Sequence, residues 1–145
     1  MYTSVTDAPR RRVLRHAAGE LGAALFCGVF GMIYEHFSHE VYSYYMLYAF
    51  MFPLAAGLVL VLMALSSRPP ARRFLNLFNS ASATLALGSI AAGVVEIYGS
   101  TNRLLLVYQL AGGLLLTASV FTYIFEKPKL KGSEAQLHPY GGPAQ

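Results

Sequence analysis

Residues 43–65 have the sequence SYYMLYAFMFPLAAGLVLVLMAL, in which no side chain is charged. A helix needs about 20 mainly apolar residues to cross a hydrocarbon core about 30 Å thick. Strands of a membrane barrel need only about 10 residues and alternate apolar with polar side chains, a pattern that is absent here. Because backbone groups in lipid must find their partners within the segment, the stretch predicts a transmembrane helix.

Further apolar stretches of similar length lie at about 17–34, 74–97 and 104–125. The connections between the four stretches are short, and short connections make consecutive helices antiparallel neighbours. We therefore expect an all-α membrane protein, an antiparallel bundle of four transmembrane helices that occupies residues 17–125. Residues 1–16 would form a basic segment before the bundle. Residues 126–145, which are rich in proline and glycine, would form a flexible tail.

The composition also points to a membrane and away from other classes of protein. Charged residues make up 12% of the chain, whereas about 25% is usual in soluble domains. The net charge of +4 does not indicate nucleic-acid binding, because no basic stripe is interleaved with aromatic residues. The connections are too short for a soluble catalytic domain, so we expect neither an enzyme nor a cofactor. The single cysteine, Cys27, excludes an internal disulfide.

Basic clusters predict the orientation in the membrane, because Lys and Arg collect on the cytoplasmic side. The clusters lie within residues 10–15, 68–73 and 127–131, which share one side if the chain crosses four times. The opposite side then keeps only Arg103. We therefore expect a multi-pass protein of the cell membrane with both termini in the cytoplasm. Tyrosines near the outer helix ends fit a belt at the headgroup level, with stacking on a ligand as the alternative.

The two halves of the chain resemble each other. Residues 31–38 have the sequence GMIYEHFS, and residues 92–99 have the sequence AGVVEIYG. In both, a glutamate is followed two residues later by an aromatic residue and then by a small one. Two repeated helical hairpins in parallel orientation are one interpretation. Chance similarity between apolar segments is the other.

Glu35 and Glu96 are the strongest candidates for a functional site. Each ends a helix face of small residues, and such faces let helices approach closely. A carboxylate near a membrane interior is costly to ionise, so it tends to be paired, protonated or functional. One interpretation is a proton or cation relay. The alternative is a pair of helix-end anchors that bond to tyrosine hydroxyls or to Arg103.

Glu20 lies on nearly the same face of the first helix as Glu35, roughly 22 Å away at about 1.5 Å per residue. It could extend a relay across the membrane. It could instead pair with Arg15 or His16 at the inner boundary.

Residues 35–40, EHFSHE, form the only cluster of residue types that bind transition metals. His36, His39 and Glu40 could supply two imidazoles and a carboxylate to zinc. The order differs from the His-Glu-x-x-His of zinc proteases, and no third histidine is near. A pH-responsive loop and an ordinary solvated loop are the alternatives.

The third apolar stretch is unusually polar, with Asn79 and Ser82 on about one face. Gln109 and Thr117 form a comparable line on the fourth. Polar groups need partners in lipid, so we expect both helices to form hydrogen bonds in the interior. A polar lining for a solute path is the alternative.

Proline and small residues predict two local features. Pro53 removes one backbone hydrogen bond and frees the carbonyl of Ala49, which predicts a kink in the second helix. Ala24, Gly28 and Gly31 share one face of the first helix, which predicts a close helix contact there.

These features favour an accessory or interaction subunit of a membrane complex. Its partners would be the lipid bilayer and either another membrane protein or further copies of the chain. The alternative is a small oligomeric transporter or channel, coupled to protons or cations, with Glu35 and Glu96 on its path.

Overall fold

The structure is a computed structural model that describes residues 7–38, 42–66, 70–100 and 102–125. All regular structure in these residues is helical. The elements are α1 (Asp7–Phe37), α2 (Tyr44–Tyr48), α3 (Met51–Leu65), α4 (Arg72–Ile97), the short 3-10 helix η1 (Arg103–Leu105) and α5 (Leu106–Phe125). The expected all-helical class is therefore confirmed for the described part of the chain.

Four segments are long and apolar enough to cross a membrane. They are Pro9–Phe37, Tyr44–Leu65, Arg72–Ile97 and Arg103–Phe125. By length and composition, the chain is thus suited to cross a membrane several times, as the four apolar stretches predict.

The first helix is longer than the expected stretch 17–34, because it already begins at Asp7 in the basic segment. Pro9 suits this position, since the first turn of a helix does not need its missing amide hydrogen. Val13 and Ala17 are buried in a core cluster, and such packing stabilises added helical turns. The cluster is completed by Leu60, Ala64, Phe74 and Leu75. Part of the basic segment therefore extends α1.

The second span is broken close to Pro53. α2 ends at Tyr48 and α3 begins at Met51. The proline ring would clash with the carbonyl of Ala49, four residues earlier, and the proline cannot donate to that carbonyl. In the turn between α2 and α3, the amide of Ala49 donates to the Met46 carbonyl over 3.3 Å. This bond spans three residues and makes the turn tighter than in an α-helix. The predicted kink is present as a break between two helices.

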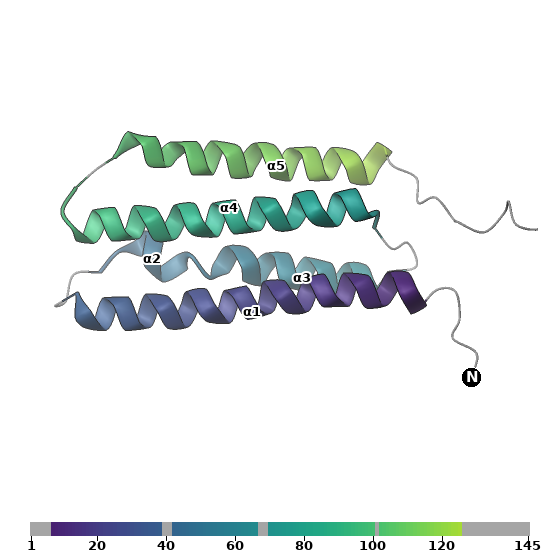
Figure 1. The fold of residues 1–145 in the computed structure, drawn as a ribbon, viewed down its shortest axis with the longest axis horizontal. Helices are drawn as coiled ribbons and strands as arrows, with labels where there is room; N and C mark the ends of the chain where they lie inside the picture. Colours follow the sequence, from purple (N-terminus) through teal and green to yellow (C-terminus); the bar gives the residue numbers. More distant parts are fainter. Residues whose placement is uncertain (1–6, 39–41, 67–69, 101, 126–145) are drawn as a thin grey trace, which may run out of the picture.

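Helix α4 has the most neighbours in the described structure. Figure 1 shows the long helices side by side, with α3 between α1 and α4 in this view and α5 beyond α4. The closest packing is of α1 on α3 and of α5 on α4, while α4 also packs on α1, α2 and α3. Helix α5 packs mainly against α4. It is consequently the least buried of the long helices.

Both of these closely packed pairs contain a glycine set against a leucine. A Cβ atom placed on Gly57 of α3 would lie 2.9 Å from Cδ2 of Leu21 in α1. A Cβ placed on Gly112 of α5 would lie 2.6 Å from Cδ2 of Leu85 in α4. In both cases the leucine backbone nitrogen would be 3.4 Å away. A larger residue at either position would require the leucine side chain to move, so the two contacts are built alike.

Helix α2 packs against α1 and α4 through Met46, which is 1% exposed. A Cβ on Gly31 of α1 would lie 3.3 Å from the Met46 carbonyl oxygen. A Cβ on Gly93 of α4 would lie 2.8 Å from both the Met46 nitrogen and its Cβ. The predicted close contact on this face of α1 is therefore present at Gly31. Gly93, the matching glycine of α4, packs against Met46 from the other side.

Candidate functional site

Glu20 lies in the interface between α1 and α4 and is only 6% exposed. The hydroxyl of Ser82 donates to its Oε2 over 2.8 Å. This partner differs from those expected from the sequence, since Glu20 pairs with neither Arg15 nor His16 among the described contacts. One turn earlier, the side-chain amide of Asn79 donates to Nδ1 of His16 over 2.7 Å. Side chains three or four residues apart share a helix face, so the two bonds join the same two faces.

Hydrogen bonds in the interior come from α4 to a greater extent than from α5. Asn79 and Ser82 bond to α1, as described above. On α5 the hydroxyl of Thr117 donates to the carbonyl of Gly113 in its own helix, over 2.9 Å. Oε1 of Gln109 is buried and has no hydrogen-bond partner in the described structure. The expectation of interior bonds is therefore correct for α4, but these two residues of α5 form no such bond, because α5 packs at the edge.

The two strongest candidates from the sequence, Glu35 and Glu96, have different surroundings. Oε2 of Glu96 accepts a short hydrogen bond from the hydroxyl of Ser43, the residue that precedes α2. Glu35 is half-buried, and its Oε1 is enclosed without a hydrogen-bond partner in the described residues. No described ion pair joins either carboxylate to Arg103. Glu20 lies near the middle of α1, about four helical turns before Glu35, so the structure does not bring the three carboxylates into one cluster.

The backbone after Glu96 sets the position of Arg103. Gly99 has φ of 69°, in the left-handed region that glycine adopts without strain. The amide of Ser100 donates to the Val95 carbonyl and that of Gly99 to the Glu96 carbonyl, a pattern that closes a helix C-terminus. The side chain of Asn102 then accepts from the Leu104 amide over 2.9 Å and caps η1. These bonds end α4 and begin the next span within a few residues.

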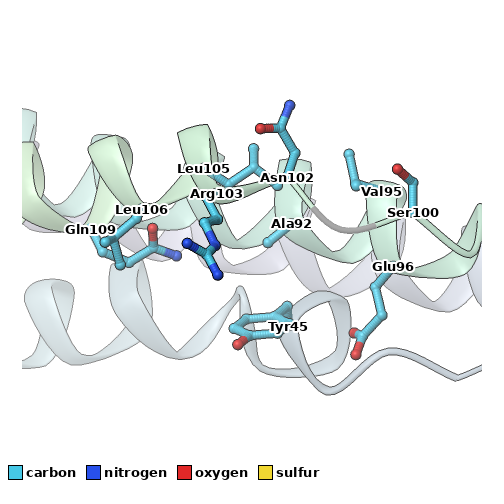
Figure 2. Close-up of a pocket in the computed structure, with 10 residues that line it drawn as sticks. All are labelled: Tyr45, Ala92, Val95, Glu96, Ser100, Asn102, Arg103, Leu105, Leu106 and Gln109. Carbon is cyan, nitrogen blue, oxygen red and sulfur yellow. The ribbon is translucent and has the colours of Figure 1, made fainter.

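A pocket of about 540 Å³ lies beside this turn, between α2, α4 and the start of α5. Its polar lining is Tyr45, Glu96, Ser100, Asn102, Arg103 and Gln109. In the view of Figure 2, Arg103 and Gln109 lie to one side of the Tyr45 ring and Glu96 lies to the other. The pocket therefore offers a cationic and an anionic side chain together with a buried acceptor that has no partner.

Sequence reasoning did not identify this pocket as a site. It singled out Glu96 and Gln109 separately and treated Arg103 only as a partner for a glutamate. One signal was available: Arg103 is the sole lysine or arginine between residues 74 and 126. An isolated cation at the start of an apolar span is costly unless it reaches the headgroup level or a ligand.

The metal site proposed by residue type is only partly within the described structure. His36 is exposed in the last turn of α1, and its ring packs edge-on against Phe37 at 5.6 Å between centroids. His39 and Glu40 lie outside the described residues. Within those residues, no group of three or more His, Cys, Asp or Glu side chains is placed to hold a metal ion.

The candidate residues thus divide between two regions. Glu20 belongs to a hydrogen-bonded interface between α1 and α4, whereas Glu96 belongs to an open pocket that can receive a polar ligand. No protein-family model, no curated protein and no solved structure matches this chain.

Proposed function

We propose that the chain is an accessory or interaction subunit of a membrane complex. The observation that carries this proposal is the one-sided packing of α5. Only 11% of the most apolar part of its span is buried within the chain, against 28–33% for the other three spans. Its exposed side chains include Leu110, Leu114 and Phe121. A helix of another subunit would cover this surface and leave α4 at the centre of the assembly.

Photo-crosslinking in cells tests this surface directly. A photoreactive amino acid at Leu114 of α5, which is 71% exposed, should give a discrete cross-linked protein band. The matched control is Leu25 of α1, which is 70% exposed and should give lipid adducts without such a band. Lipid adducts alone at Leu114, or equal protein cross-linking at both positions, would contradict a specific surface on α5.

We further propose that the four spans form an antiparallel bundle in the cell membrane, with both termini in the cytoplasm. The short connections and the basic clusters within residues 10–15, 68–73 and 127–131 support this topology. Single cysteines at Ser66 and Ser100, in a Cys27→Ala background, provide the test. An impermeant thiol reagent added to intact cells should label Ser100→Cys and leave Ser66→Cys unlabelled, and the reverse pattern would overturn the topology.

A repeat of two helical hairpins is part of the same proposal. Support comes from the matching contacts of Gly57 with Leu21 and of Gly112 with Leu85, and from Gly31 and Gly93 on Met46. In this arrangement α4 and α5 correspond to α1 and α3. The main departure is the break in the second span, for which α5 has no proline.

The alternative function is that of a small transporter or channel coupled to protons or cations. Glu35 favours it, because a half-buried carboxylate with an unpartnered oxygen could bind a proton or cation. The bonds of His16 with Asn79 and of Glu20 with Ser82 favour the interaction subunit, because they use polar side chains to join α1 and α4. Flux through the isolated protein distinguishes the two functions.

A further inference from the structure

The pocket beside Glu96 differs in chemistry from the other large pockets of the described structure. Three others, of about 380, 440 and 500 Å³, have no charged side chain in their lining. The pocket beside Glu96 combines a guanidinium and a carboxylate with apolar walls that include Val95, Leu105 and Leu106. Its volume of about 540 Å³ falls in the range of sites that hold small organic ligands.

The two charged groups in the lining specify the chemistry of a ligand. Arg103 makes no ion pair among the described residues, and a guanidinium suits the paired oxygens of a phosphate or carboxylate. Glu96 uses Oε2 for the bond from Ser43, so that Oε1 is left for a donor. The ligand therefore needs an anionic group for Arg103 and a cationic donor for Glu96.

We propose that this pocket binds a zwitterion in which an anionic group and a protonated amine are joined by a short linker. The phosphoethanolamine headgroup of a membrane lipid has this chemistry, and so do soluble zwitterions of similar size. Arg103 binds the phosphate, Glu96 accepts from the ammonium group, and the apolar walls contact the adjoining carbon chain. This site does not depend on the role of the chain as an interaction subunit.

Native mass spectrometry of the full-length protein with lipids of matched acyl chains tests the site. Phosphatidylethanolamine should bind in preference to phosphatidylcholine, whose quaternary ammonium has no hydrogen to donate. It should also bind in preference to phosphatidylglycerol, which has no positive charge. Equal binding of all three lipids would overturn the proposal.

Two substitutions in the pocket and one control outside it connect the binding to this site. Arg103→Gln should weaken phosphatidylethanolamine binding at least about tenfold, since it removes a charge-assisted contact. Arg15→Gln, which removes the same charge from the N-terminal part of α1, outside the pocket, should leave binding unchanged. Glu96→Gln keeps a hydrogen-bonding group beside Ser43 and removes the charge, so it should shift the preference toward phosphatidylglycerol. Unchanged affinity and preference in both pocket variants would exclude the pocket.

Competition by glycerophosphoethanolamine, which lacks acyl chains, would support a soluble zwitterion as the ligand, and absence of competition would support the lipid.

Discussion

The two ends of the interface around α1 and α4 use the same kinds of side chain in different ways. Toward the N-terminal ends, Glu20 and His16 accept hydrogen bonds from Ser82 and Asn79 across the interface. Toward the C-terminal ends, α2 intervenes, and Glu96 accepts from Ser43 instead of from α1. A carboxylate within a span can therefore join helices where they touch directly, and it becomes available to a ligand where a third element separates them.

The largest effect on stability is expected at Gly93, where α4 packs closely on Met46 of α2. Gly93→Ala should destabilise the protein by about 1–3 kcal/mol, because the new Cβ would overlap Met46 and force a backbone shift. Gly113→Ala on α5 is the matched control, since a Cβ there has no neighbour within 4 Å. Thermal denaturation in detergent measures both. Equal melting temperatures for the two variants would show that α2 is not seated closely on α4.

At the end of the interface that contains Glu20, the stability of the protein should depend on the hydroxyl donor of Ser82. Ser82→Ala removes the described partner of Glu20 and should cost about 1–3 kcal/mol, the penalty for an unsatisfied buried polar group. Ser80→Ala is the control, because the same change there affects an exposed side chain of α4. Chemical denaturation should separate the two variants clearly. If Ser82→Ala lowered the free energy of unfolding no more than Ser80→Ala does, the hydrogen bond between Ser82 and Glu20 would be contradicted.

A much smaller effect on stability is expected at Glu35. Glu35→Gln keeps the size of the side chain, and Oε1 of Glu35 makes no described hydrogen bond, so the change should stay within about 0.5 kcal/mol. The same denaturation experiment measures it. A loss as large as that of Ser82→Ala would mean that Glu35 also has a structural partner, and the contrast between the two ends would disappear.

The parts of the fold that depend on local sequence could be predicted. Uninterrupted apolar stretches define the helices, Pro53 explains the break before α3, and glycine marks the close contact at Gly31. The partner of Glu20 could not be predicted in this way. Arg15 and His16 are near in sequence, but Ser82 becomes a neighbour only when α4 packs on α1, and helical periodicity does not specify that contact.

The pocket beside Glu96 was missed for a related reason. Its lining comes from α2, α4 and the segment from Ser100 to Gln109, and the turn at Gly99 determines how these parts meet. Sequence alone indicated that Gln109 is polar and that Arg103 is isolated, without showing that they line the same space as Glu96. The roles proposed for Glu35 and Glu96 in a relay stay predictions.

An interaction subunit should carry no flux on its own, and measurement of proton and cation flux in liposomes that contain only this protein tests this most directly. The predicted result is flux no greater than in protein-free liposomes, both for the unmodified protein and for Glu35→Gln and Glu96→Gln. The contradictory result is clear flux through the unmodified protein that both substitutions abolish while folding and insertion stay normal. Gln keeps the size of Glu and cannot ionise, so that result would assign the carboxylates to a transport path.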